Sequence, residues 1–412
     1  MANLATRNQP ESIRYSSREP ILTATQKVIG YKLFFRSAAN QPMRSDLVGE
    51  QLDALFHVSS LVGLNTLSDR RLAFLTCSHQ SLVENHILLL PAERAVLEIP
   101  RTVPATEEVL AICHRLKQAG YRIALECVTR NDPRESLFEL ADFLKISIHR
   151  VPTAEIESMT SHHRHSRTRL LADRVETWDD FQRARSAGFQ YFQGHFFRRP
   201  ETQRAHRVGS IRAIGLRLLQ TIHKPTLDWY AIEDTLKRDA TLSYRLLRYL
   251  NSAAFGLRSE VHSIRQALTL LGEDEFRRWC RLAIFLDTAQ NRPSDLVLSA
   301  LIRARFAELI GLQLNSADTD LFLLGLLSLM DAILEIPMTD VLDGLPLGAD
   351  IRTALVDHQG PLALVFDLVL AIEAGAWGST VRLCEALHLD PDRVAAESLQ
   401  AMEWAQMLLA PA

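Results

Sequence analysis

Residues 116–126, LKQAGYRIALE, and residues 183–193, RARSAGFQYFQ, share one transition from a helix into a strand. Each stretch ends a helical pattern at Ala-Gly and then enters a strand that carries aromatic residues. Glycine suits that boundary because it readily adopts the left-handed backbone conformation that ends many helices. We therefore predict that the first half of the chain repeats a unit of one strand and one helix.

The two strands of these stretches belong to a series of strand candidates that alternate with amphipathic helical stretches. The candidates are residues 28–35, 72–77, 95–99, 122–126, 143–147, 170–172 and 189–193. Seven or eight such units within about 200 residues favour a TIM-like barrel over an open doubly wound sheet, which usually has fewer. The predicted fold of this half is an α/β barrel.

After Pro200 the strand patterns stop, and helical stretches rich in leucine and alanine follow one another. We predict a barrel domain over residues 1–205 and an all-α domain over residues 206–412, with residues 206–222 as a connecting helix. Asp228 is a candidate N-cap for the helix that follows it. The apolar residues 321–334 predict one core helix, because they are too few to span a bilayer.

The composition is that of a globular protein, with 47% hydrophobic and 23% charged residues. Five cysteines without a Cys-x-x-Cys pair, and an N-terminus without the apolar segment of a signal peptide, predict a cytoplasmic protein without a membrane segment. The net charge is −3, but residues 293–412 hold 5 basic and 17 acidic side chains. Because this end would repel a phosphate backbone, we expect no nucleic-acid partner.

Several short motifs of the first half resemble, in order, those of the EAL domain, the magnesium-dependent phosphodiesterase module that cleaves cyclic di-GMP. They lie at residues 18–21, 30–36, 124–127, 142–147, 172–177 and 193–200. The resemblance covers roughly residues 15–200 and implies a barrel of the EAL type. The Glu-Ala-Leu signature itself is replaced by Lys-Leu-Phe at residues 32–34.

A two-metal phosphodiesterase needs several oxygen ligands that converge on ions about 4 Å apart. By the resemblance, Lys32, Thr76, Cys127 and Ser147 stand where the family has glutamate, asparagine, aspartate and aspartate. An ammonium group repels Mg²⁺ by the same Coulomb interaction that would attract it to a carboxylate. We therefore predict no bound metal, no cofactor and no catalytic residue, and that the chain is not an enzyme.

Lys32 can also be interpreted as a replacement for a cation that pairs with Glu98 or Glu126 and preserves the shape of the pocket. That arrangement would leave a nucleotide receptor in which Arg36 and Lys145 face phosphates. The positions that we predict as candidate ligand contacts of this degenerate pocket are Lys32, Arg36, Thr76, Glu98, Glu126, Cys127, Lys145, Ser147, Asp173 and Gln193.

The second half resembles the HDOD domain, a helical relative of the HD phosphohydrolases, over about residues 210–400. The resemblance rests on residues 239–242, 246–253, 263–268 and 270–272. Metal-dependent HD enzymes need a His-Asp doublet, and this sequence has no His-Asp dipeptide. The resemblance therefore implies a helical domain without catalysis.

The two resemblances imply a bacterial signal-transduction protein of cyclic di-GMP networks. We predict that it is cytoplasmic and acts through protein–protein interaction. Two alternatives stay open: a cyclic di-GMP receptor that does not hydrolyse its ligand, and a residual cyclic di-GMP phosphodiesterase. The sequence does not identify the protein partner, and it leaves self-association into a homo-oligomer open.

Overall fold

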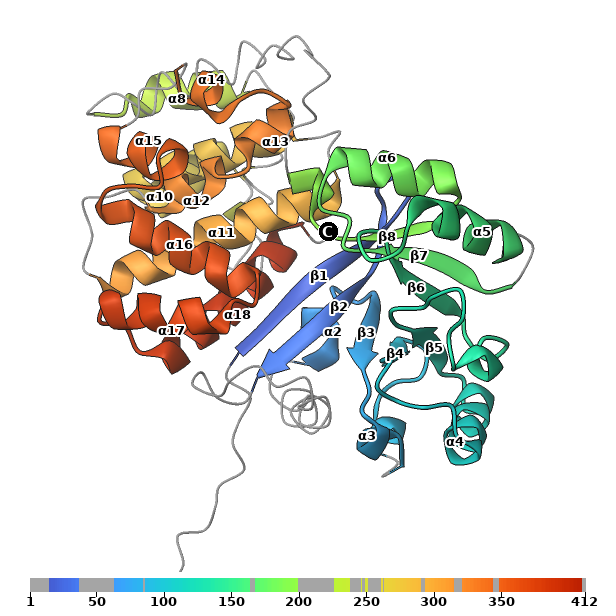
Figure 1. Cartoon of the computed structure of the whole chain (residues 1–412). Coiled ribbons are helices and arrows are strands. Elements are labelled where there is room, and N and C mark those ends of the chain that lie inside the picture. The colour runs from blue at the N-terminus through green and yellow to red at the C-terminus, as the bar shows by residue number, and fades with distance from the viewer. Residues whose placement is uncertain are drawn as a thin grey trace, which may run out of the picture. The chain divides into compact units, whose positions relative to one another are not determined.

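A closed eight-stranded barrel and a set of helices make up the computed structural model of the chain (Figure 1). The residues that the structure describes are 15–36, 63–83, 86–163, 167–198, 226–237, 246, 249–250, 261, 263–289, 293–314, 321–343 and 348–409.

The barrel strands pair in chain order, and β8 closes the barrel against β1. The strands are β1 (Tyr15–Thr23), β2 (Val28–Arg36), β3 (Leu72–Thr76), β4 (Ala95–Ile99), β5 (Arg122–Leu125), β6 (Phe143–Ser147), β7 (Arg169–Asp173) and β8 (Tyr191–Gln193). Strands β2 to β8 run parallel, whereas β1 is antiparallel to both of its neighbours. The prediction of a TIM-like barrel is confirmed.

Strand β1 is absent from the strand candidates because its sequence is polar at its start and contains Pro20. Proline cannot donate a hydrogen bond to a neighbouring strand. The position is tolerated because β8 pairs with β1 only over Ile21–Thr23, so Pro20 has β2 alone beside it. The four residues between β1 and β2 are too few for a crossover, and this short connection makes the two strands antiparallel.

Both predicted transitions from helix to strand are present. Helix α4 (Glu107–Gln118) leads into β5, and α6 (Trp178–Ala187) leads into β8. Gly188 caps α6 at φ 101°, in the left-handed region. At the start of α6, Thr177 and Asp180 form a capping box. The other helices of the barrel are α2 (Gly63–Leu67), α3 (His79–Val83) and α5 (Thr153–His163), with 3₁₀ turns η1 (His86–Leu89), η2 (Glu135–Leu137) and η3 (Phe196–Arg198).

One apolar layer fills the barrel with inward-facing side chains from six strands. Its members are Ile21, Phe74, Val96, Ala124, Phe143 and Leu171. The Phe74 and Phe143 rings meet edge to face, with centroids 5.3 Å apart. Because residues two positions apart in a strand face the same side, the next inward residue on each strand forms a second layer above this one.

The described helices of the second half are α8 (Trp229–Lys237), α10 (Ile264–Thr288), α11 (Ser294–Gln313), α12 (Leu321–Leu327), α13 (Met330–Leu334), α14 (Met338–Asp343), α15 (Ala349–Val356), α16 (Pro361–Glu373), α17 (Trp377–Ala386) and α18 (Pro391–Leu409). Asp228 caps α8, since its Oδ1 accepts a hydrogen bond of 3.1 Å from the Ala231 backbone. The single helix predicted over residues 321–334 is wrong, because α12 and α13 divide this segment. The Ser328 hydroxyl donates to the Gly325 carbonyl and accepts from the buried Arg303 where α12 ends.

The chain divides by packing into two compact units. One contains residues 1–199 and 364–399, and the other contains residues 200–363 and 400–412. Within the first unit Arg198 Nη1 lies 3.0 Å from Glu373 Oε1, so the end of α16 is ion-paired to the barrel. The predicted boundary after residue 205 and the predicted connecting helix at 206–222 lie outside the described residues, and both stay predictions.

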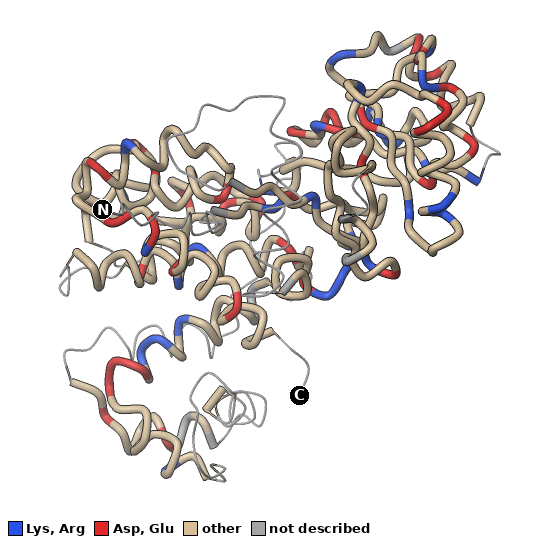
Figure 2. Tube along the Cα trace, turned by 90° about the horizontal axis from the view of Figure 1, so that it is seen from below, with Lys and Arg blue, Asp and Glu red and all other residues tan. Residues whose placement is uncertain are grey.

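Basic and acidic residues are interspersed along the described trace, as Figure 2 shows. Among the described helices, no single one is both long enough and apolar enough to cross a membrane. Helices α15 and α16 meet these two criteria only when they are counted together, and they are bent by 45° relative to each other.

Candidate functional site

A layer of polar and charged side chains lies at the carboxyl ends of the parallel strands, directly above the apolar layer of the barrel. Each of its members stands two residues beyond a member of the apolar layer, and they are Thr76, Glu98, Glu126, Lys145 and Asp173. Lys32 joins them from β2, and Glu19 joins them from β1, where it is the register partner of Lys32. In barrels of this kind the carboxyl ends of the strands carry the active site, so this mouth is the candidate functional site.

Two ammonium groups and two carboxylates form the centre of the mouth. Lys32 Nζ lies 3.1 Å from Glu98 Oε2 and donates a short hydrogen bond to Glu126 Oε1. Lys145 Nζ donates to Glu98 Oε1 and lies 3.6 Å from Glu126 Oε1. We call these four residues the paired cluster; in it Lys32 pairs with both glutamates that the sequence offered as partners.

Burial and charge oppose each other in the paired cluster. Burial alone would lower the pKa of Lys32, but Glu98, Glu126 and Asp173 raise it well above its usual value. Burial also raises the pKa of Glu126, whereas Lys32 and Lys145 lower it below its usual range. The pKa of Glu98 is raised by burial against the lowering effect of the same two ammonium groups. Lys32 is therefore charged at neutral pH.

The paired cluster in this arrangement does not fit Mg²⁺. Both oxygens of Glu98 and Oε1 of Glu126 already face ammonium nitrogens. Mg²⁺ requires near-ideal octahedral coordination by oxygen atoms, and the Lys32 ammonium would lie beside it and repel it.

The other predicted contacts come from the ends of β2, β3, β6 and β7 and from the residues after β5. Thr76 Oγ1 donates to Glu98 Oε2 at 3.4 Å. Ser147 is 3% exposed, and its hydroxyl makes no hydrogen bond within the described part of the chain. Cys127 follows β5 in the left-handed region, with φ 52°, and Asp173 is the register partner of Ser147. Arg36 ends β2, but its side chain lies outside the described residues.

Arg134 fixes the loop that follows Glu126. Its guanidinium donates to the Glu126 carbonyl at 2.7 Å and to the Ile99 carbonyl at 3.1 Å, and pairs with Asp132 at 2.8 Å. The side chains of Arg134 and Asp132 are 1% and 0% exposed. A buried pair of this kind stabilises the fold only while both partners are present.

We expect Arg134→Met to lower the free energy of unfolding by about 3–5 kcal/mol, because it leaves the Asp132 carboxylate buried and unpaired. Burial raises the pKa of Asp132, but hydrogen bonds from Arg134 lower it below its usual value. The Asp132 carboxylate therefore contributes to the free energy of unfolding at pH values above its unfolded pKa of about 3.9. This contribution disappears as the pH falls through the lower pKa of the folded state. Urea unfolding between pH 3 and 7 measures both effects.

The matched control for Arg134→Met is Arg183→Met, whose side chain is 57% exposed and pairs with Asp180 at 2.6 Å. We expect that surface change to cost less than about 1 kcal/mol. Equal losses in the two variants would contradict the structural role assigned to Arg134.

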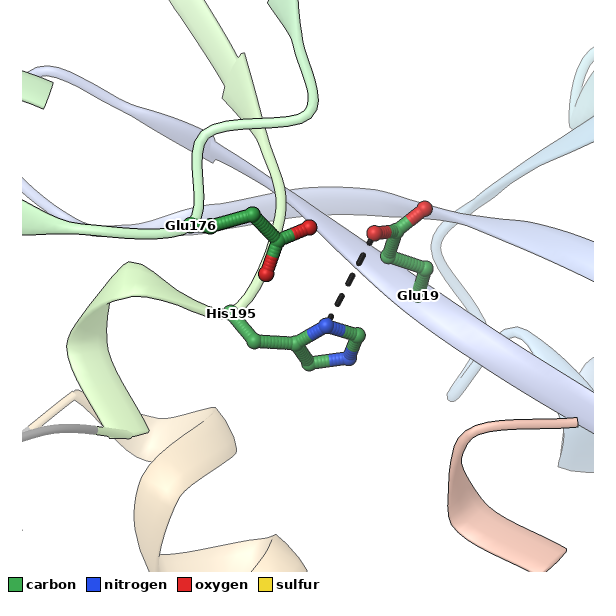
Figure 3. Close-up of side chains that lie close together, drawn as sticks. All are labelled: Glu19, Glu176 and His195. Atoms are coloured by element: carbon green, nitrogen blue, oxygen red, sulfur yellow. Dashed lines mark ion pairs between the residues drawn. The ribbon is translucent and has the colours of Figure 1, made fainter. Parts of the chain in front are cut away.

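A second group of side chains at the mouth contains one predicted contact, Gln193, and three residues that the sequence analysis missed. Gln193, at the end of β8, donates through Nε2 to Glu19 Oε2. His195 Nδ1 lies 3.7 Å from Glu19 Oε1, and the Glu176 carboxylate faces both (Figure 3). Glu176 and His195 follow the carboxyl ends of β7 and β8 by only a few residues, and that position was the signal that could have identified them. Glu19 could not be recognised in this way, because β1 itself was not predicted.

Comparison with protein families and relatives identifies what the chain is similar to. The HDOD domain family matches residues 209–338. The cyclic di-GMP phosphodiesterase CdgJ of Vibrio cholerae is 30% identical over 398 residues, which cover 95% of this chain and 92% of CdgJ. The uncharacterized protein YuxH of Bacillus subtilis is 27% identical over 406 residues, or 96% of this chain and 98% of YuxH.

Solved structures give a weaker likeness that is confined to about half of the chain. A manganese and cyclic di-GMP complex of BlrP1 from Klebsiella pneumoniae matches 47% of this chain and 56% of its own, at 18% identity and a TM-score of 0.37. An EAL domain protein of Listeria monocytogenes matches 48% of this chain and 94% of its own, at 15% identity and a TM-score of 0.35. The assignment of the barrel rests on its strand pairing.

The prediction that the chain is not an enzyme is wrong by these comparisons, because a relative that aligns with 95% of the chain is named a phosphodiesterase. The prediction took the loss of four family ligands as the loss of the site. It left out Glu19, Glu176 and His195, which only the fold brings to the same mouth.

Proposed function

Since this chain belongs to the family of proteins that join an EAL-type barrel to an HDOD domain, the family that includes CdgJ, we propose that the mouth of its barrel binds cyclic di-GMP. The observation that carries the proposal is the polar layer at the carboxyl ends of the strands. Buried polar groups are normally hydrogen-bonded, so the Ser147 hydroxyl is suited to a ligand atom at this place.

The two lysines of the paired cluster offer charged hydrogen-bond donors to a phosphate, beside the carboxylates that neutralise their charge. An ammonium group has three donor hydrogens. Lys145 donates one of them to Glu98 and lies 3.6 Å from Glu126, beyond hydrogen-bond distance, so donor hydrogens remain for a phosphate oxygen. Charge-assisted hydrogen bonds of this kind are roughly twice as strong as neutral ones.

Cleavage of cyclic di-GMP is the second candidate function, and the name of CdgJ favours it. The reaction adds one water across one phosphodiester bond and opens the ring of the nucleotide. In this chain the nucleotide would meet a mouth in which Glu98 and Glu126 are already paired with ammonium groups.

We further propose that the helices transmit the bound state to a partner protein. The route in the barrel's own packing unit is short, because His195 at the mouth is followed by Arg198, which pairs with Glu373 at the end of α16. A ligand that moves the segment after β8 would change this ion pair. A pull-down from the native host with and without cyclic di-GMP tests this step.

For binding itself, we expect calorimetry with cyclic di-GMP and Mg²⁺ to give a measurable dissociation constant, and Lys145→Ala to weaken it about tenfold or more through the loss of a charged hydrogen bond. Chromatography of the nucleotide after prolonged incubation then separates binding from cleavage, because cleavage yields the linear dinucleotide.

Ser147→Ala is a smaller change than Lys145→Ala, because it removes one hydroxyl and no charge. We expect a smaller loss of affinity, while the exposed change Glu157→Gln on α5 should leave the affinity unaltered. No heat of binding with the native chain would refute the proposal, and an unchanged dissociation constant in Lys145→Ala would refute the placement of the phosphate.

A further inference from the structure

Three side chains from separate parts of the barrel converge beside the paired cluster: Glu19 in β1, Glu176 after β7 and His195 after β8 (Figure 3). One ligand atom from each lies within 4.8 Å of the other two. We propose that Glu19, Glu176 and His195 bind a divalent transition-metal cation, with Zn²⁺ as the best-matched ion.

The chemistry of the donors selects the ion. One imidazole nitrogen and two carboxylate oxygens are ligands that Zn²⁺ binds at about 2.0–2.2 Å, usually in a tetrahedron. The ligand atoms of such a tetrahedron lie about 3.4 Å apart. A small rotation of the side chains would bring the three ligand atoms from their present separations of up to 4.8 Å to this distance. Glu176 is exposed and free of the barrel core, which allows that rotation and gives the ion a way in. Three protein ligands leave the fourth position for water or a ligand oxygen.

The backbone holds the three residues in place without any ion. The Val175 backbone donates to the Gln193 carbonyl at 2.9 Å, and the Phe196 backbone donates to the Val175 carbonyl at 3.2 Å. These two hydrogen bonds tie the segment that carries Glu176 to the segment that carries His195. The site is therefore built by the fold.

Gln193 acts as a supporting residue for this site. Its side chain is 2% exposed, and its amide donates to Glu19 Oε2. That bond directs the remaining oxygen, Oε1, toward His195 Nδ1. Outer partners that orient a ligand in this way are typical of metal sites.

The surrounding charges also favour a cation. Glu19, Glu98, Glu126 and Asp173 are electrostatically coupled to the ammonium groups of Lys32 and Lys145, and Glu176 adds a further carboxylate at the rim. Carboxylates therefore outnumber ammonium groups in this part of the mouth. Burial raises the pKa of Glu19, the hydrogen bond from Gln193 lowers it, and Asp173 raises it again. A divalent ion would stabilise the carboxylate form of Glu19.

An ion pair between protonated His195 and Glu19 is the simpler interpretation of their 3.7 Å contact. It accounts for two of the three side chains and predicts no affinity for a metal. The two interpretations therefore differ in a quantity that can be measured without any nucleotide, so a failure of cyclic di-GMP binding does not affect the outcome.

We expect calorimetric titration of the chelator-treated full chain with ZnCl₂ to show one binding equivalent that both His195→Gln and Glu176→Gln lose or weaken at least about tenfold. The readout is the difference between each variant and the native chain, which cancels any Zn²⁺ that binds elsewhere. Glu157→Gln is the matched control, because it removes the same charge from an exposed position on α5. Far-ultraviolet circular dichroism of each variant verifies that it is folded.

Thermal unfolding gives an independent measure, because an ion that binds only the folded state raises the melting temperature. Zn²⁺ should raise it for the native chain and for Glu157→Gln, and should raise it less for the two ligand variants. Equal Zn²⁺ stoichiometry and equal stabilisation in all four proteins would overturn the proposed site, as would a native chain that binds no Zn²⁺.

Discussion

Gly194→Ala is expected to lower the free energy of unfolding by more than about 3 kcal/mol, which is among the largest effects of a single methyl group. Gly194 has φ +144°, and a Cβ there would lie 2.0 Å from the Val175 carbonyl oxygen, 2.7 Å from its carbon and 2.8 Å from its nitrogen. All three are backbone atoms, which cannot move aside as a flexible side chain can. Urea unfolding followed by circular dichroism measures the loss.

Gly188→Ala is the matched control for Gly194→Ala. Gly188 also has positive φ, +101°, but a Cβ at this position meets nothing within 4 Å. Its expected cost is the backbone strain alone, about 1–2 kcal/mol. The difference between the two variants isolates the close approach of the segments after β7 and β8. Similar losses in both variants would show that this approach is not tight.

We expect Lys32→Glu to lower the stability of the metal-free protein and to create affinity for Mg²⁺ that the native chain lacks at this place. The change replaces an ammonium by a third carboxylate beside Glu98 and Glu126, and like charges in a buried group repel each other. An additional oxygen ligand also replaces the charge that repels the ion. Thermal unfolding with EDTA and with increasing Mg²⁺ measures both effects.

Lys32→Met separates the two contributions of Lys32→Glu, since it removes the ammonium without adding a ligand. In EDTA the melting temperature should fall from the native chain to Lys32→Met and again to Lys32→Glu. The increase in melting temperature caused by Mg²⁺ should be largest for Lys32→Glu and smallest for the native chain. The affinity of Lys32→Glu for Mg²⁺ should exceed that of the native chain at least about tenfold, or by about 1.4 kcal/mol. If Lys32→Glu is as stable as the native chain in EDTA, the paired cluster does not have the charges assigned to it.

Most of the barrel could be predicted from the sequence because its parallel strands are short apolar runs between helices. Residues 116–126 and 183–193 contain both the glycine that ends a helix and the strand that follows it, so they specify their local structure without help from distant residues. Strand β1 could not be predicted in this way, because Pro20 and the polar residues before it form a strand only against β2 and β8. The break between α12 and α13 could not be predicted either, because it lies where the Ser328 hydroxyl accepts a hydrogen bond from Arg303, which is distant in the sequence.

The candidate site was predicted in part. Glu98, Glu126 and Lys145 were identified as positions that resemble those of the EAL family, and the structure brings them together with Lys32. Glu19, Glu176 and His195 lie within the motifs at residues 18–21, 172–177 and 193–200, but they were not recognised as one group, because only the closed barrel brings them together.

The sequence by itself determined the type of fold and the identity of the charges at the barrel mouth, because strand periodicity and side-chain chemistry are local properties. Only the tertiary structure decided which charges meet. Closing the barrel places Glu19 beside Gln193 and His195, which are more than 170 residues away in the chain. Electrostatic interactions depend on distance in space, and that distance is fixed only when β8 pairs with β1.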